Sequence, residues 1–269
     1  MKIYERDYTI LTDEELDEWE RIKEKESITK DGKKLLFRKN LFREYPKAAR
    51  HYISLFPNNY LDINELEESE KLIPFLDLFL ELLDGAQTDE RAILNFIKEK
   101  KAYFLVGAIL RGYFNFGHHD AYIIPEFMLG VSYKVDYLLI GKNSGGYEFV
   151  FVEFEKPRGR ITNGDGELGE VFRKGLNQVQ DWDTWLDSNY SSLYEVFSKY
   201  KHPEIQRDGE FLKYDKTRIH FVVVAGRRDD FTEKTYRIKR SKFDREKISV
   251  LHYDNLFDVA KELIGKSTY

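Results

Sequence analysis

The 269-residue chain contains no cysteine, two methionines and only six prolines. The absence of cysteine excludes a disulfide framework, a thiolate zinc site, an iron–sulfur cluster and a cysteine nucleophile. Long apolar runs are also absent, since the most apolar stretch, residues 72–83, is interrupted by Asp77 and Glu81. We therefore expect no membrane-spanning segment. The first ten residues lack the apolar run of a signal peptide, which favours a cytoplasmic location.

Neither sign of charge dominates the composition. Lysine and arginine total 43 against 48 aspartates and glutamates, for a formal net charge of -5. With 42% hydrophobic and 34% charged residues, the chain is too apolar for a disordered protein and too charged for a membrane protein. Its 20 phenylalanines and 18 tyrosines can fill a sizeable core. Mild acidity does not exclude a local basic groove for nucleic acid.

The first 85 residues have mainly helical patterns. Thr12 and Glu15 have the spacing of a capping box, which predicts a helix over residues 13–26. Further helices are expected over residues 46–56 and 74–83, each with proline in its first turn. Gly85 ends the last of these helices. We place a domain boundary there, between a mainly helical region, 1–85, and a second domain, 86–269.

The second domain alternates helices with strands. We expect a helix over residues 89–101, strands over 122–128, 135–140 and 147–155, a long helix over 168–186, strands over 218–225 and 248–252, and a last helix over 254–263. This order predicts an α/β fold with a mixed sheet flanked by helices.

The second and third of these strands carry the informative carboxylates. A six-residue turn, 141–146, would join them as a hairpin and pair Asp136 with Phe151. Residues two apart in a strand share a face, so Glu153 and Glu155 would lie on the face of Asp136, whereas a turn of odd length would reverse this facing. Three carboxylates on one face repel one another unless a cation lies between them. Oxygen ligands without histidine or cysteine suit Mg²⁺ or Mn²⁺, while a solvated face is the alternative.

Four short motifs give the chain a family resemblance. They are Pro125-Glu126-Phe127, Val135-Asp136-Tyr137-Leu138-Leu139, Phe151-Val152-Glu153-Phe154-Glu155-Lys156-Pro157, and Gln178 on the long helix. Together they resemble the core of the PD-(D/E)xK nucleases, and residues 88–265 are similar to the nuclease domain of the Shedu anti-phage defence proteins. The resemblance implies a restriction-endonuclease-like fold, a metal-dependent DNA endonuclease, assembly as a homo-oligomer, and a regulatory or oligomerisation role for residues 1–85.

The resemblance also implies roles for the hairpin residues. Asp136 and Glu153 would bind the metal ion, with help from the carbonyl of Phe154. Glu155 stands where the family usually has lysine, and it would be a third ligand or a base that activates water. Lys156 would offset charge if the strand ends or bulges at the following proline. Because of this exchange of lysine for glutamate, the alternative is a catalytically inactive nuclease fold that binds nucleic acid or a protein partner.

Basic and polar residues outside the hairpin complete the expected site. On the long helix, Gln178 lies at the edge of the apolar stripe and Lys174 lies one turn earlier on the same edge, where they would position water and neutralise phosphate. Expected phosphate contacts elsewhere are Arg158, Arg160, Arg227 and Arg228. The basic run 237–242 is more typical of a solvated loop than of a phosphate-contact zone.

Two further acids have open roles. Glu126 either joins the metal site or bonds a neighbouring strand end. Glu90 is most simply a first-turn residue favoured by the helix dipole, although helix acids sometimes complete the site in this superfamily.

Overall fold

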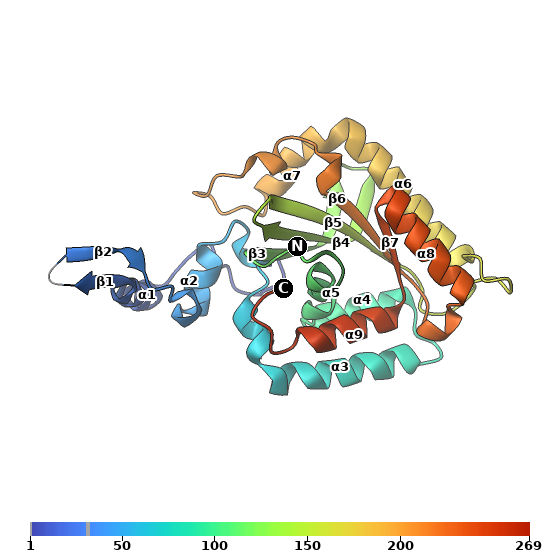
Figure 1. Cartoon of the computed structure of the whole chain (residues 1–269), viewed down its shortest axis with the longest axis horizontal. Coiled ribbons are helices and arrows are strands. Elements are labelled where there is room, and N and C mark those ends of the chain that lie inside the picture. Colours follow the sequence, from blue (N-terminus) through green and yellow to red (C-terminus); the bar gives the residue numbers. More distant parts are fainter. Residues whose placement is uncertain (1, 31–32) are drawn as a thin grey trace.

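A mixed five-stranded sheet lies between two layers of helices in the computed structural model, which describes residues 2–30 and 33–269 (Figure 1). The strands follow the order β3 (Asp120–Leu129), β4 (Tyr133–Asn143), β5 (Gly146–Phe154), β6 (Ile219–Val224) and β7 (Ile248–Leu251). Strands β3, β4 and β5 are antiparallel neighbours, whereas β6 is parallel to β5 and β7 is parallel to β6. The predicted α/β fold with a mixed, helix-flanked sheet is confirmed.

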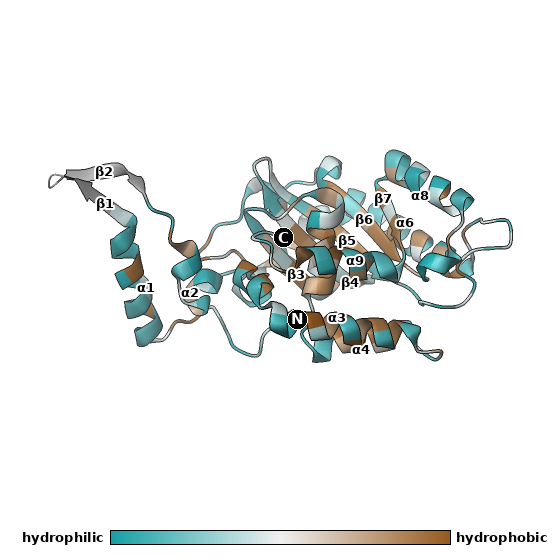
Figure 2. Ribbon diagram, turned by 60° about the horizontal axis from the view of Figure 1, so that its bottom comes forward, coloured by the Kyte–Doolittle hydropathy of each residue, from teal (hydrophilic) through white to brown (hydrophobic). Residues whose placement is uncertain are grey.

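Alternation along β5 separates the two layers of the core. Phe149 and Phe151 belong to the cluster under α6 (Glu170–Asn189) and α7 (Leu193–Ser198). Val150 and Val152 belong to the opposite cluster, with α3 (Ser69–Asp84), α4 (Glu90–Glu99), α5 (Phe104–Ile109) and α9 (Tyr253–Leu263). Figure 2 shows the apolar sheet enclosed by helices whose outer surfaces are polar. The sheet is therefore buried on both faces, so its side chains can reach solvent only at its ends.

Helix α1 (Asp13–Glu26) lies away from this body (Figures 1 and 2), although Ile3, near the N-terminus, is buried in the core of the body. Helix α1 begins at the predicted capping box of Thr12 and Glu15. A two-stranded sheet of β1 (Ser27–Lys30) and β2 (Lys33–Arg38) follows, where no strands were predicted. Helix α2 (Lys47–Tyr52) ends four residues before its predicted end, because the N–H and hydroxyl of Ser54 both bond to the carbonyl of His51.

Residues on both sides of position 85 share one hydrophobic core. Helix α3 begins five residues before the predicted start, with Pro74 inside it, and packs against α9. Leu76 and Phe79 from α3 lie in the same cluster as Ile93 and Ile97 from α4. Tyr60 also bridges Tyr122 on β3. The division of the chain at residue 85 therefore stays a prediction.

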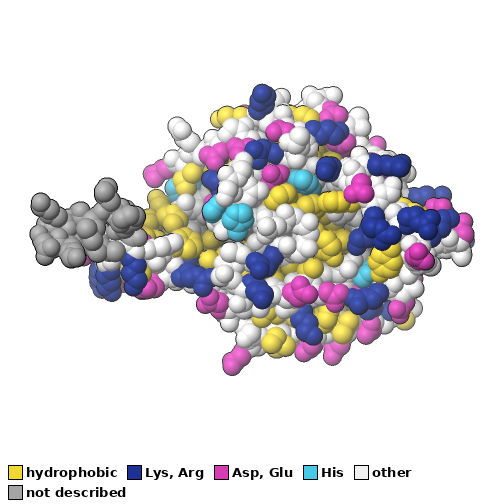
Figure 3. All heavy atoms as spheres, in the orientation of Figure 1, with side chains coloured by type: hydrophobic (Ala, Val, Ile, Leu, Met, Phe, Trp, Pro, Cys, Tyr) yellow, Lys and Arg dark blue, Asp and Glu magenta, His cyan; other side chains and the backbone are white. Residues whose placement is uncertain are grey.

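The basic run 237–242 lies in a helix, so the predicted solvated loop is wrong. Helix α8 (Glu233–Glu246) begins at Thr232 and has only Thr235 buried, so it lacks the apolar stripe that marks a helix in a sequence. Figure 3 shows lysine and arginine side chains spread over this end of the molecule. Helix α5 was also missed, for the opposite reason: all six of its residues are buried and no polar face sets a period. No helix within residues 2–30 and 33–269 has both the length and the apolarity needed to cross a bilayer.

Candidate active site

The β4–β5 hairpin sets Asp136 opposite Glu153. Tyr137 pairs with Val152 and Asn143 with Gly146, and one more step of this register brings Asp136 to Glu153. The turn has two residues, 144 and 145, so the predicted six-residue turn is wrong and the register differs by two. An even shift preserves the facing of every side chain, which is why the carboxylates still share a face.

The error in the turn comes from glycines that belong to the strands. Gly141 lies within β4, where a Cβ atom would come within 2.7 Å of the Cβ of Phe116, so packing requires glycine there. Gly146 begins β5 with a φ of +110°, a backbone conformation that favours glycine. Both glycines therefore belong to the strands, and a tight two-residue turn joins β4 to β5.

Asp136 is held in place by the backbone of the neighbouring strand. Its Oδ2 atom accepts a hydrogen bond of 2.8 Å from the N–H of Phe154. Burial, together with the negative charges of Glu90 and Glu155, raises the pKa of Asp136 to about 7, although this hydrogen bond opposes the rise. At neutral pH the carboxyl group is therefore close to its midpoint of ionisation.

Glu153 is the least satisfied carboxyl group of the site. Only 4% of the residue is exposed, and its Oε2 atom has no hydrogen-bond partner. Burial raises the pKa of Glu153 to about 10, with further contributions from Asp136 and Glu155. A buried carboxylate without a partner is costly, so this oxygen needs either a proton or a cation.

Glu155 differs because a lysine holds it. The Nζ atom of Lys174 lies 2.9 Å from both carboxylate oxygens of Glu155, of which only 2% is exposed. Burial raises the pKa of Glu155, while the ammonium group of Lys174 opposes that rise. Helix α6 comes close enough because residue 175 is glycine: a Cβ there would meet Val223 Cγ1 at 2.7 Å and Glu155 Cγ at 3.1 Å.

Glu155 is also fixed through its backbone. The hydroxyl of Tyr253, which is buried at the start of α9, donates a hydrogen bond of 2.6 Å to its carbonyl. The N–H of Glu155 bonds to the carbonyl of Val224 on β6 at 2.8 Å. The segment that carries the acids is thus anchored from both sides after β5 ends at Phe154.

The remaining predicted residues take different positions. Lys156 is exposed beyond the end of β5, and Gln178 is half-buried on α6. Gln178 lines an open hollow with Lys134, Arg173 and Lys174. The side chain of Phe154 packs against the rings of Tyr137 and Tyr253, and its N–H serves Asp136.

Three of the four predicted phosphate-binding arginines make internal contacts. Arg158 donates to the carbonyls of Leu83, Asp84 and Gly85 at the end of α3. Arg227 pairs with Asp254 and Asp84, and Arg228 pairs with Asp258. Arg160 is exposed in the loop before α6.

A cavity of about 450 Å³ opens beside Asp136 and contains residues that sequence reasoning did not place there. Its lining includes Glu90, Arg91 and Lys98 from α4, together with Glu126 and Lys134 from the sheet. The Glu126 carboxylate pairs with Lys134 at 2.8 Å, and its φ of +51° marks a kink in β3 opposite Asp136. The sequence left open a place at the site for Glu126 and for Glu90, and both line this cavity, whereas Arg91, Lys98 and Lys134 were not predicted there.

The described part of the chain contains no group of three or more histidine, cysteine, aspartate or glutamate side chains that could hold a metal ion. Lys174 engages Glu155, whereas the salt bridges of the described residues include none for Asp136, Glu153 or Glu90. Mg²⁺ commonly binds through one or two carboxylates and retains several waters. The unpartnered oxygen of Glu153 beside Asp136 fits such an ion.

Two comparisons bear on identity. Residues 87–257 match the protein family described as Shedu protein SduA, C-terminal. A search of curated proteins returns no match.

Proposed function

The chain belongs to the Shedu family, and from this premise we propose that it is a Mg²⁺- or Mn²⁺-dependent endonuclease that hydrolyses DNA phosphodiester bonds. The family indicates a role in anti-phage defence. Action in the cytoplasm and assembly as a homo-oligomer belong to the same proposal. The observation that carries it is the buried, unpartnered oxygen of Glu153 beside Asp136 at the end of the sheet.

The proposed metal ligands are Asp136, Glu153 and the carbonyl of Phe154. When bound, the ion would stabilise a phosphate oxygen and lower the pKa of a water molecule. Burial and the neighbouring carboxylates raise the pKa values of both acids, so the site gives up protons when a cation arrives. The hydrogen bond from Phe154 N–H orients Asp136 before any cation binds.

Lys174 supplies the lysine that the hairpin lacks. The position two residues after Glu153 is occupied by Glu155, whose carboxylate holds the ammonium group of Lys174 from α6. We assign to Lys174 the role of stabilising negative charge on the phosphate, with Glu155 as its positioning residue. Gln178, one turn further along α6, would orient the attacking water. A lysine at the site thus favours an active enzyme over the inactive binding module.

The cations around the cavity are suited to a DNA backbone. Arg91 and Lys98 are exposed on α4, Lys134 lies on β4, and Arg173 is exposed on α6. Arg91 and Lys98 line the cavity beside Asp136, and Arg173 lines the adjoining hollow. Lys134, by contrast, pairs with Glu126, and Arg227 and Arg228 pair with aspartates. Contacts of this kind bind phosphates without reading sequence.

DNA cleavage by the purified protein tests this proposal. Linear and circular DNA are incubated with Mg²⁺, Mn²⁺ or EDTA, with Glu153→Gln purified in parallel to detect a contaminating nuclease. We expect cutting that requires metal and is lost in the variant. Absence of cutting on every substrate, together with no change in melting temperature on adding either metal, would leave the inactive binding module as the better account.

A further inference from the structure

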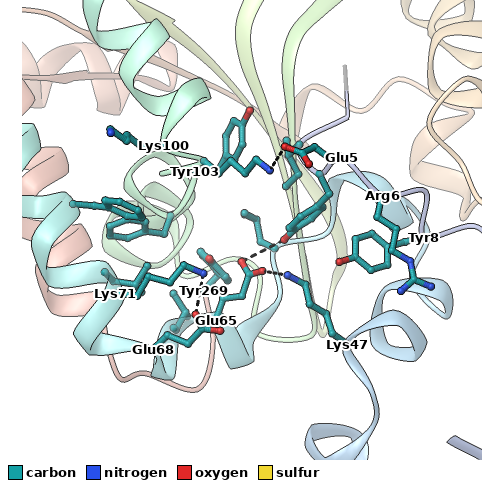
Figure 4. A pocket seen from close by; sticks show the side chains of 18 residues that line it. Glu5, Arg6, Tyr8, Lys47, Glu65, Glu68, Lys71, Lys100, Tyr103 and Tyr269 are labelled. Carbon is teal, nitrogen blue, oxygen red and sulfur yellow. Dashed lines mark hydrogen bonds and ion pairs between the residues drawn. The ribbon is translucent and has the colours of Figure 1, made fainter. Parts of the chain in front are cut away.

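A second cavity, of about 380 Å³, lies apart from the carboxylates (Figure 4). The N-terminal segment, residues 63–67, helix α3 and residues 100–104 form its walls. Its volume is in the range of small-molecule sites and is too small for a polymer. Tyr103 lines this cavity and also the cavity beside Asp136, so the two are neighbours with a shared wall.

Aromatic rings supply much of the lining. Tyr4, Phe75, Tyr103, Phe104 and Tyr269 line the space and come from four segments of the chain. Figure 4 shows Tyr103 and Tyr269 beside the charged side chains of the cavity. Aromatic side chains of this kind offer π-faces on which a planar ring can stack.

Cations outnumber acids around these rings. The lining contains Arg6, Lys47, Lys71, Lys100 and Lys101 against Glu5, Glu65 and Glu68. Each of the three acids already has a cation: Glu65 pairs with Lys47, Glu68 with Lys71 and Glu5 with Lys101. Arg6 pairs with Glu15 outside the cavity, and the salt bridges of the described residues include none for Lys100. Lys100 is therefore the lining cation that no acidic partner neutralises there.

Lys47 lies beside the aromatic rings of the cavity. Its Nζ atom lies 4.6 Å from the centroid of the Tyr4 ring and pairs with Glu65. Burial lowers the pKa of Lys47, but the Glu65 carboxylate outweighs this effect, and the pKa lies above its usual value. Lys47 therefore stays charged within the cavity.

We propose that this cavity binds a nucleoside phosphate. The rings would stack on the base, Lys100 would contact the phosphate, and the Glu65 and Glu68 carboxylates would accept hydrogen bonds from sugar hydroxyls. Inorganic phosphate would use only the cation, and a nucleoside would use only the rings and the carboxylates. Both should therefore bind more weakly than a nucleotide. The proposal depends on this cavity alone and holds whether or not the carboxylate site cleaves DNA.

Isothermal titration calorimetry of the full chain tests the proposal. AMP, ATP, GMP, adenosine, inorganic phosphate and pyrophosphate are titrated in EDTA, which removes any metal from the carboxylate site. The variants are Phe75→Ala, for stacking, and the double variant Lys71→Glu/Lys100→Glu, for phosphate contact. Lys213→Glu is the matched control, because that lysine is exposed and lies outside the cavity. Circular dichroism melting checks that each variant is folded.

We expect at least one nucleotide to bind with a dissociation constant below about 1 mM, at least tenfold tighter than adenosine or inorganic phosphate. The double lysine variant and Phe75→Ala should each weaken that affinity about tenfold or more, while Lys213→Glu leaves it unchanged. The proposal is wrong if no nucleotide gives saturable heat. It is also wrong if pyrophosphate binds as tightly as the nucleotides, or if the folded cavity variants bind like the wild type.

Discussion

Replacing Glu153 with glutamine should stabilise the metal-free protein. The wild-type carboxyl group is buried, its Oε2 atom has no partner, and its pKa is raised to about 10. At pH 8 it stays protonated in the folded protein but ionises in the unfolded chain. A glutamine fills nearly the same volume, and because it does not ionise, its stability contribution does not depend on pH.

The magnitude follows from this difference in protonation. Each pH unit over which the folded protein retains the proton costs about 1.4 kcal/mol of stability. From the ordinary pKa of 4.5 to pH 8, the upper bound is about 5 kcal/mol. Relaxation at the end of the strand lowers this bound, and we expect a gain of ~2 kcal/mol, which raises the melting temperature by roughly 4–8 °C.

The pH dependence of stability independently tests whether the Glu153 carboxyl group destabilises the folded protein. Because the folded-state pKa lies above the unfolded value, the folded protein binds more protons, and its stability falls as the pH rises from about 4.5 towards 10. Asp136 adds to this slope between its ordinary pKa of 3.8 and about 7. In EDTA, the melting temperature of the wild type should therefore fall more steeply between pH 6 and 9 than that of Glu153→Gln.

The assay is thermal melting by circular dichroism in EDTA, repeated with Mg²⁺ or Mn²⁺. Glu70→Gln is the matched control, because Glu70 is exposed on α3. Metal should raise the melting temperature of the wild type and of the control but not that of Glu153→Gln. A melting temperature for Glu153→Gln in EDTA several degrees below that of the wild type would refute the reasoning.

Three further outcomes follow from the contacts of single side chains. Lys174→Gln removes the cation assigned to the phosphate and leaves Glu155 without its partner, so the rate of cleavage in a single-turnover assay should fall ~10²-fold. Cleavage at the wild-type rate would contradict the role of Lys174. Arg91→Ala should weaken DNA binding, measured by fluorescence anisotropy, and reduce the slope of log affinity against log salt by about 0.9, whereas Arg228→Ala should leave both nearly unchanged; equal effects would contradict the proposed DNA surface. Arg50→Met leaves the fully buried Asp62 without its arginine partner, so the free energy of unfolding in urea should fall by about 3–5 kcal/mol. A fall below about 1 kcal/mol would contradict this expectation.

Local patterns in the sequence predict most of the secondary structure. Alternation along β5 separates the two faces of the sheet, and the capping box at Thr12 marks the start of α1. These features depend on neighbouring residues alone. The hairpin register was wrong because Gly141 suits a turn by composition, while its position in β4 depends on the distant Phe116.

The surroundings of the acids were harder to predict than the acids themselves. Asp136, Glu153 and Glu155 lie close in sequence on one hairpin, so strand geometry alone puts them on one face. Glu90 and Lys98 reach the cavity only when α4 packs beside the sheet, and no local period records that contact. The partnerships of Arg227 and Arg228 depend equally on where α9 lies.

Proton release on metal binding tests the central claim most directly. Titration of Mn²⁺ into the wild type at pH 8, in buffers with different enthalpies of ionisation, measures the protons released for each ion bound. The account predicts saturable binding with release of about one proton, because Glu153 is protonated and Asp136 largely ionised at this pH. Glu153→Gln should abolish both the binding and the release. Equal binding by the wild type and Glu153→Gln, or binding with no proton released, would contradict the account.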